Sequence, residues 1–340
     1  MEQTRVIVSP SPHIHGGDSI SRNMYNVLIA LIPAFAFSIY QFGWQSIIVT
    51  ALSVAMCCLT EWFITTVMLR RKCYLGDGSA ILTGVLLAFN LPSTLPWWII
   101  LIGAFIAIGV GKMAFGGLGN NIFNPALVGR VFLLISFPAQ MTTWPVAQHL
   151  ANAMAATDAT TMATPLSIMK GVIKGAPGVS LDQLPDAFSL FLGLNPGSMG
   201  EISAVALLIG LVYLLATRTI TWHIPVAILA TVGVFSGILW CANPEMYVSP
   251  LVHLCSGGVM LGAIFMATDY VSSPMSKGGQ IVYGVLIGVL TMVIRTWGAY
   301  PEGMSFAILI MNAFTPLINV YMKPKLFGDK VKVNKKEAAK

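Results

Sequence analysis

A glycine- and asparagine-rich run in the first half of the chain has the residue types of a ligand site. The run covers Phe115 to Ala126 and reads FGGLGNNIFNPA. Asn124 is suited to cap a helix, and Pro125 fits the first helical position. Glycines let a backbone approach a ligand closely, and a helix N-terminus offers unpaired N–H groups and a partial positive charge. The run suits a phosphate, an electron-rich carbonyl or a reduced flavin; the alternative is a packed helix cap without a ligand.

A few ionisable residues interrupt apolar segments, and each is a candidate for chemistry. Glu61 and Arg130 lie well inside such segments, while Asp77 and Asp269 lie near the ends of two others. A lone charge in hydrocarbon costs about 3 kcal/mol or more, so each needs a partner, a proton or a water-filled cavity. Glu61, Asp269 and Asp77 are therefore candidates for a cation or proton path. The alternatives are an Arg–Glu pair and a helix-end carboxylate at the interface, which is favoured for Asp77.

A threonine-rich stretch lies in the longest polar connection. It reads DATTMATPL from Asp158 to Leu166. Such clusters commonly form turns, in which the hydroxyls bond to the local backbone. A threonine hydroxyl can also be esterified by a phosphate, which would tether a flavin mononucleotide where no soluble pool refills the site. The residues alone leave both interpretations open.

The composition is that of an integral membrane protein. Of 340 residues, 56% are hydrophobic and 9% are charged, against about 25% charged residues in a soluble domain. The mean hydropathy is +0.78, so the apolar excess needs lipid as its solvent. The net charge of +6 does not indicate nucleic-acid binding, because seven of the nineteen lysines and arginines lie in the last eighteen residues. Such a basic tail is suited to an anionic membrane surface. The five cysteines form no CxxC pair and predict no metal site.

We expect about ten transmembrane helices, because a spanning helix needs about 20 mostly apolar residues. The third and fifth candidates are short and bordered by glycine, proline and asparagine, which predicts broken or re-entrant helices. The ten segments are 25–40, 45–68, 79–89, 96–113, 124–137, 201–217, 223–240, 250–270, 279–294 and 303–322.

The basic residues predict which side of the membrane each connection faces. With both termini in the cytoplasm, fifteen of the nineteen lysines and arginines lie on the cytoplasmic side, as the positive-inside rule requires. Lys170, Lys174 and Arg295 lie outside, and Arg130 lies within a span. The 139–200 connection is then extracytoplasmic, and long loops in compact folds are usually functional or disordered.

Two stretches resemble each other weakly. Residues 79–87 read SAILTGVLL and residues 257–265 read GGVMLGAIF, and a glycine-rich turn follows each after a further span. The copies start on the third and eighth segments, so they cross the membrane in opposite directions. Inverted repeats of this kind place a binding site near the midplane. We therefore expect an all-α membrane protein with two inverted five-helix repeats and broken helices.

The expected organisation has five parts. They are a cytoplasmic N-terminal segment at 1–24, a first five-helix repeat at 25–138, an extracytoplasmic flavin-bearing loop at 139–200, a second five-helix repeat at 201–322 and a basic cytoplasmic tail at 323–340.

Over nearly its whole length the chain resembles a known family of membrane redox subunits. It is similar to the D subunits of Rnf ion-translocating electron-transport complexes, which are related to the B subunits of sodium-translocating NADH:quinone reductases. The short N-terminus and the tail favour the Rnf branch. The landmarks stand in order: SPH at 11–13, residues 77–84, GGLGNNIFNPA at 116–126, ISFPAQMT at 135–142, WHIP at 222–225, MLGA at 260–263, ATD at 267–269 and AYPEG at 299–303.

The resemblance implies flavin cofactors. The family joins flavin mononucleotide (FMN) to a threonine through a phosphoester bond, and its attachment pattern falls on Thr164, with Met162 standing where glycine is usual. A second flavin, riboflavin held without a covalent bond, is implied at Asn121, Asn124 and Gly119.

The resemblance also implies one subunit of an ion-translocating oxidoreductase, with reduced ferredoxin as donor, NAD as acceptor and Na+ or H+ as the ion. Its partners would be the other Rnf subunits and the lipid of the inner (plasma) membrane. We expect no catalysis by the chain alone, because it has no cysteine set for iron–sulfur clusters and no dinucleotide-binding domain. A channel or transporter for a small solute is the rival class, since inverted repeats and broken helices describe it equally well. A purely structural scaffold leaves the outer loop unexplained.

Overall fold

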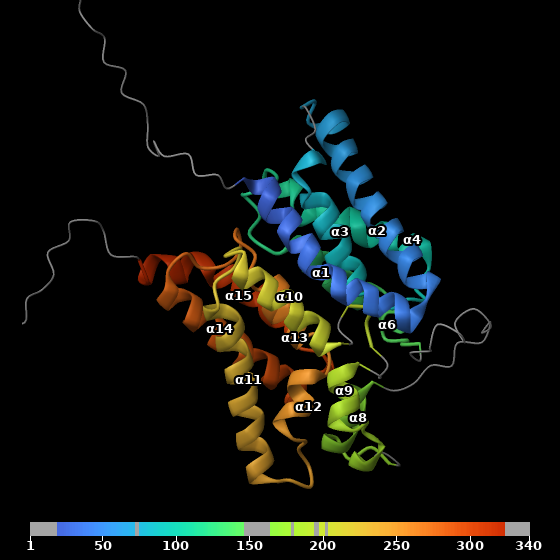
Figure 1. Cartoon of the computed structure of the whole chain (residues 1–340), viewed down its shortest axis with the longest axis vertical. Helices are drawn as coiled ribbons and strands as arrows, with labels where there is room; N and C mark the ends of the chain where they lie inside the picture. Colours follow the sequence, from blue (N-terminus) through green and yellow to red (C-terminus); the bar gives the residue numbers. More distant parts are fainter. Residues whose placement is uncertain are drawn as a thin grey trace, which may run out of the picture.

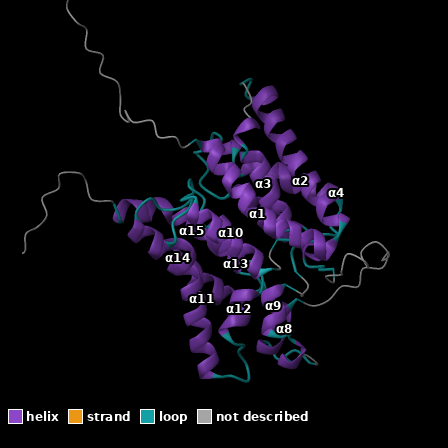
Figure 2. Cartoon of the chain, in the orientation of Figure 1, coloured by secondary structure: helices purple, strands orange, loops and turns teal. Residues whose placement is uncertain are grey.

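The computed structural model describes residues 19–71, 75–145, 164–177, 180–193, 197–200 and 203–323. Within these ranges the regular structure is helical and no strand forms, which confirms the expected all-α class (Figure 2). Figure 1 shows the blue start and the red end of the described chain on the upper left of the molecule, with α8 and α9 at the lower right.

In the first half, five described helical segments follow one another, and two of them change from α- to π-helical before they end. The glycine- and asparagine-rich run joins the short turn η4 (Met113–Phe115) to the fifth segment. The five are α1 (Ile20–Phe42), α2 (Trp44–Phe63) with η1 (Ile64–Met68), α3 (Ser79–Phe89) after the turn η2 (Leu75–Asp77), α4 (Trp97–Phe105) with η3 (Ile106–Val110), and α5 (Pro125–Ser136).

The described part of the second half is also helical, and its helices range from 3 residues in α13 to 21 residues in α14. Short helices occupy the connection between the halves: α6 (Pro138–Met141), α8 (Pro165–Ile173), η5 (Leu181–Gln183) and α9 (Ala187–Leu192). The second half then comprises α10 (Ala204–Ala216), α11 (His223–Ala242), α12 (Pro250–Cys255), α13 (Val259–Leu261) with η6 (Gly262–Met266), α14 (Lys277–Trp297) and α15 (Met304–Tyr321).

All ten predicted segments fall on helices, but six of the described helices have the length and apolarity of a membrane span. The helices α3, α5 and α10 have 11, 12 and 13 residues. The third and fifth segments are thus as short as predicted, the sixth is shorter, and the count of ten spans stays a prediction. The six are Ile20–Phe42, Trp44–Met68, Trp97–Phe115, His223–Ala242, Lys277–Trp297 and Met304–Tyr321.

The eighth predicted segment, 250–270, is interrupted in the structure, a break that was expected only in the third and fifth segments. Helix α12 ends at Cys255, and Gly257 adopts a φ of 65°, a conformation that side-chain-bearing residues rarely take. Arg295 donates to the carbonyl oxygens of His253 at 2.7 Å and Ser256 at 2.9 Å. These bonds satisfy backbone groups that the break would otherwise leave unpaired.

The two halves use matching contacts. Helix α2 packs on α3 and α4, as α11 packs on α12 and α14, and α4 packs on α5 as α14 packs on α15. Between the halves, α1 contacts α10 and α5 contacts α15. Small residues permit close approach in membranes: a Cβ on Gly84 of α3 would lie 2.6 Å from the Cα of Val54 in α2. The inverted-repeat relation itself stays a prediction.

Large apolar side chains cover the outside of the described helices. Trp44, Val212 and Ile238 are 65%, 66% and 66% exposed, and they lie on three different helices. Soluble proteins rarely expose extensive apolar surface, whereas lipid solvates such a surface. Together with six helices of spanning length, this makes the chain a multi-pass membrane protein.

Candidate functional site

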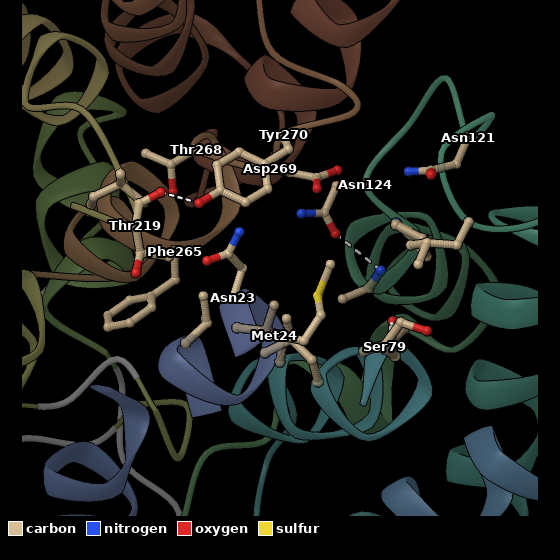
Figure 3. A pocket seen from close by; sticks show the side chains of 18 of the residues that line it. Asn23, Met24, Ser79, Asn121, Asn124, Thr219, Phe265, Thr268, Asp269 and Tyr270 are labelled. Atoms are coloured by element: carbon tan, nitrogen blue, oxygen red, sulfur yellow. Dashed lines mark hydrogen bonds between the residues drawn. The ribbon is translucent and has the colours of Figure 1, made fainter. Parts of the chain in front are cut away.

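A cavity lies where α1, α3, α5 and α10 approach the segment that follows η6. Amides and hydroxyls project into it among apolar side chains (Figure 3). We call it the first cavity. Its lining comprises Asn23, Met24, Val27, Ser79, Leu82, Thr83, Leu86, Lys112, Leu118, Asn121, Asn124, Pro125, Ala126, Leu214, Thr219, Ile220, Phe265, Thr268, Asp269 and Tyr270.

Asn124 is fixed in this wall by its role as a helix cap. Its Oδ1 accepts from the N–H groups of Ala126 at 3.1 Å and Leu127 at 3.4 Å. Its Nδ2 donates to the carbonyl of Met266 at 3.1 Å. Pro125 occupies the first position of α5, so the predicted cap is confirmed and the helix N-terminus lies at the cavity.

Asn121 has an unused acceptor in the same wall. Its Nδ2 donates to the Phe123 carbonyl at 3.1 Å, but its buried Oδ1 has no hydrogen-bond partner among the described residues. Buried polar atoms normally have a partner, so the atom fits an N–H or O–H donor on a molecule in the cavity. Gly119 is exposed, has a φ of 92° and does not line the cavity; it forms the turn that leads to Asn121.

Asp269 is the carboxylate in the described lining of the first cavity. The hydroxyl of Ser272 donates to its Oδ2 at 2.9 Å. Figure 3 shows the side chains of Asn23, Asn124 and Asp269 turned toward the same space. The position suits either a cation or a donor on a bound ligand.

Glu61 is held by a partner that the sequence analysis counted as a cytoplasmic charge. Lys112 Nζ lies 2.7 Å from each of its carboxylate oxygens and 2.7 Å from Ser79 Oγ. Ser79 in turn donates through its N–H at 3.0 Å and its Oγ at 2.9 Å to Asp77. Asp77 therefore accepts bonds at the start of α3 as a helix-end carboxylate, and its place at a membrane interface stays a prediction. Glu61 forms an ion pair with a lysine rather than an arginine.

A second cavity lies beside the connection between the halves. Two aromatic side chains and an ion pair form part of its wall. It is lined by Arg130, Leu134, Met141, Thr142, Trp144, Thr164, Pro165, Leu166, Gly197, Ser198, Gly257, Tyr300, Pro301 and Glu302.

Thr164 stands at the N-terminus of α8 and at the wall of the second cavity. Its half-buried hydroxyl accepts from the Ser167 N–H at 3.3 Å. A phosphate is favoured at a helix N-terminus, and the buried Oγ of Ser198 has no partner among the described residues. The wall thus fits a phosphoester on Thr164 with an aromatic ring system beside Trp144 and Tyr300. The remainder of the attachment pattern, 158–163, lies outside the described residues.

Arg130 and Glu302 form an ion pair in the wall of the second cavity. Glu302 Oε1 also accepts from the Gly258 N–H at 3.2 Å, at the break in the eighth segment. Arg130 donates to Asn90 Oδ1 as well. Arg130 therefore has the acidic partner that its place inside a span requires.

A buried polar chain connects the two cavities. Arg130, on the second cavity, donates to Asn90, and the Nδ2 of Asn90 contacts the Met266 sulfur at 3.8 Å. The carbonyl of the same Met266 accepts from Asn124, on the first cavity. The η6 segment, which follows the break, thus lies between the two sites and contacts both.

Sequence reasoning missed Lys112, Asn90 and Glu302 as members of these sites. Lys112 follows an apolar segment, so it looked like an interfacial charge, and Asn90 carried no distinctive motif. The signal available for Lys112 was the requirement that Glu61 have a partner. Contacts between residues this distant in sequence cannot be read from local patterns.

One family model and several relatives match this chain over nearly its full length. The model described as the NQR2, RnfD, RnfE family matches residues 7–328. The chain is 44% identical over 340 residues to the D subunit of the Na(+)-translocating ferredoxin:NAD(+) oxidoreductase complex of Acetobacterium woodii, covering 99% of each chain. It is 39% identical over 329 residues to the proton-translocating counterpart of Clostridium ljungdahlii, covering 94% of this chain and 96% of the relative. It is 40% identical over 329 residues to the D subunit of the ion-translocating oxidoreductase complex of Stutzerimonas stutzeri, covering 91% and 92%.

Proposed function

The chain belongs to the NQR2, RnfD, RnfE family, and from this premise we propose that it is a flavin-carrying D subunit of an Rnf-type ferredoxin:NAD oxidoreductase that moves Na+ or H+ across the plasma membrane. The relatives that match almost its full length are named as D subunits of such complexes. The chain contributes binding, orientation and electrostatics, and flavin, when bound, supplies the electron-transfer chemistry.

The covalent FMN is proposed at Thr164. The observation that carries this is the position of its hydroxyl at the N-terminus of α8, in the wall of the second cavity. A phosphoester there would be favoured by the helix N-terminus. Trp144, Tyr300 and Ser198, whose Oγ has no partner among the described residues, would help to hold the flavin.

The second flavin, riboflavin, is proposed in the first cavity. Asn121 Oδ1 is the unpaired acceptor that one of its N–H or O–H groups would fill. Asn124 holds the wall in place through the cap of α5 and its bond to Met266. Gly119 acts through the turn that leads to Asn121 and not by contact.

The residues that line each cavity support the predicted topology, because each cavity collects span ends that were assigned to one side of the membrane. The first cavity collects Asn23, Lys112 and Thr219, all on ends assigned to the cytoplasm. The second collects Thr164 and Glu302, both on ends assigned to the outside. This grouping agrees with two opposite sides of the membrane, and the bias of the lysines and arginines assigns the side of the first cavity to the cytoplasm. We therefore propose that both termini are cytoplasmic. Glu61 and Asp269 then lie on the inner part of an ion path, with Asp77 as a helix-end carboxylate beside it.

The test of the FMN assignment is a pair of variants of the purified chain on a denaturing gel under ultraviolet light. Thr164→Val should remove the flavin fluorescence of the band. Thr142→Val, a threonine on the same cavity wall, should keep it. Fluorescence that persists in Thr164→Val would refute the assignment. A colourless wild-type preparation would favour the rival class, a channel or transporter without a redox cofactor.

A further inference from the structure

Lys112 is part of both a cavity wall and an ion pair. It lines the first cavity, and its ammonium is the partner of Glu61, at 2.7 Å from both carboxylate oxygens. Its third donor goes to Ser79 Oγ, also a cavity residue. An ammonium has three donors, so every one is committed, and a new contact in the cavity requires Lys112 to give up one of the present ones.

Two carboxylates lie near Lys112: Glu61 is its direct partner, and Asp77 accepts from the Ser79 hydroxyl to which Lys112 donates. Lys112 and Glu61 are 2% and 8% exposed, so water compensates neither. In the described lining of the first cavity, Lys112 is the one cation and Asp269 the one carboxylate. Moving a buried cation away from its carboxylate leaves a charge that must find another partner. Any negative charge added to the cavity therefore changes the balance at Glu61.

The backbone on both sides of the pair departs from regular α-helix. Glu61 is followed by the π-helical segment η1 (Ile64–Met68), and Lys112 follows the π-helical segment η3 (Ile106–Val110). Short π-helical turns are frequent at functional sites. The Lys112 carbonyl also accepts from Gly117 N–H at 3.1 Å, which ties the lysine to the run that carries Asn121.

We propose that Lys112 couples the charge of the first cavity to cation binding at Glu61. The inference rests on the proposed flavin in that cavity. When negative charge enters the cavity on reduction, the ammonium of Lys112 turns toward it, and the carboxylate of Glu61 takes up a cation in its place. No covalent bond forms or breaks at Lys112. Two electrons, from those that the complex passes between ferredoxin and NAD, and one proton convert the flavin to its anionic hydroquinone, which adds one negative charge. One cation taken up at Glu61, Na+ or H+, balances that charge.

The experiment uses the full-length chain in detergent micelles with Thr164→Val, so that covalent flavin is absent, and riboflavin as the probe. Equilibrium dialysis gives the dissociation constants of oxidised and dithionite-reduced riboflavin, and their ratio measures the preference for the reduced form. One arm exchanges sodium for choline at constant ionic strength, and a second varies pH. A cation bound at Glu61 should strengthen the binding of reduced riboflavin by a certain factor. By thermodynamic linkage, reduced riboflavin strengthens cation binding by the same factor.

Four variants separate coupling from a structural role. Lys112→Gln should lower the preference for reduced riboflavin about tenfold, within the usual range of coupling between sites, and Lys112→Arg should retain it. Glu61→Gln, which frees the lysine, should raise the preference, abolish its dependence on sodium and leave only the pH dependence of the flavin's own ionisation. The double variant Lys112→Gln/Glu61→Gln leaves no unpaired buried charge and should behave like Lys112→Gln, which controls for misfolding.

An unchanged ratio in Lys112→Gln and in the double variant would overturn the coupling, as would shifts of the same sign in Lys112→Gln and Glu61→Gln. A wild-type ratio that responds to sodium and pH in the same way as that of Glu61→Gln would overturn it too. If the chain with intact Lys112 and Glu61 binds no riboflavin in either state, the proposed flavin site itself fails, and the coupling fails with it.

Discussion

Arg130 of α5 and Glu302, which are 172 positions apart in the sequence, form an ion pair in the wall of the second cavity. The pair joins the first half of the chain to the second. Because Glu302 also accepts from the Gly258 N–H, the contact continues into the break of the eighth segment. The same arginine reaches Asn90, so one side chain organises three segments around the site proposed for FMN.

Removing one partner of this ion pair should lower the stability of the folded chain. Arg130→Met leaves Glu302, whose side chain is 15% exposed, without its counter-charge, and breaking such a pair costs about 3–5 kcal/mol. We expect a lower melting temperature and a lower yield of flavin-modified chain. The double variant Arg130→Met/Glu302→Gln should recover part of the loss, and Arg71→Met, on the exposed surface, should change little. No recovery in the double variant would contradict an ion-pair origin.

The two asparagines of the first cavity should respond differently to truncation. Asn124→Ala removes a helix cap, at about 1 kcal/mol, so it should lower both stability and riboflavin affinity. Asn121→Ala removes an acceptor with no partner in the described structure and one bond to the Phe123 carbonyl, so affinity should fall while the melting temperature falls less than in Asn124→Ala. Thermal unfolding and riboflavin titration of the same preparations check this. Equal loss of stability in both variants would argue against a ligand-facing Asn121.

Gly257 should tolerate no side chain. It has a φ of 65°, and a Cβ there would lie 2.3 Å from Leu166 Cδ1. Leu166 is two residues after Thr164, the proposed attachment site. Gly257→Ala combines backbone strain of about 1–3 kcal/mol with displacement of Leu166, so it should reduce flavin attachment measured by in-gel fluorescence. Gly278→Ala, where a Cβ meets nothing within 4 Å, is the matched control. Equal fluorescence in both variants would contradict the tight packing at this wall.

Lys170 gives the stability of the chain a defined pH dependence. Burial, with a smaller contribution from Lys174, lowers the pKa of Lys170 from 10.5 to about 8, and its Nζ donates to the Tyr300 carbonyl. Between these two pH values the unfolded chain binds more protons than the folded chain, so the contribution of Lys170 to stability rises with pH.

The measurement compares melting temperatures of wild type and Lys170→Met over a pH series. The difference, wild type minus variant, should increase as the pH rises from about 8 to 10.5. Lys277→Met, at an exposed lysine, provides the control. A difference that is constant over the series would contradict the shifted pKa.

Local signals predicted the helices and one wall of the first cavity. Asn124 followed by Pro125 is a complete helix-start signal, and the structure places the cap there. Apolar length identified all ten helical segments. Gly257, however, lies in an apolar stretch long enough to span, so hydropathy alone could not reveal the break that follows α12.

Partners distant in sequence were beyond sequence reasoning. The requirement for a partner at Glu61 was predictable from the cost of a buried charge, but its identity depends on how α2 packs against the end of η3, which brings Lys112 within 2.7 Å. The same holds for Arg130 and Glu302. Tertiary packing decides these pairs, and local composition does not encode it.

Tandem mass spectrometry of the mature chain, purified from its own membranes, tests the proposed function most directly. The peptide that contains Thr164 should carry the added mass of one FMN less water, with fragment ions that assign the phosphoester to the Thr164 hydroxyl. An unmodified Thr164 peptide, or the same mass on another residue, would contradict the role proposed for this threonine.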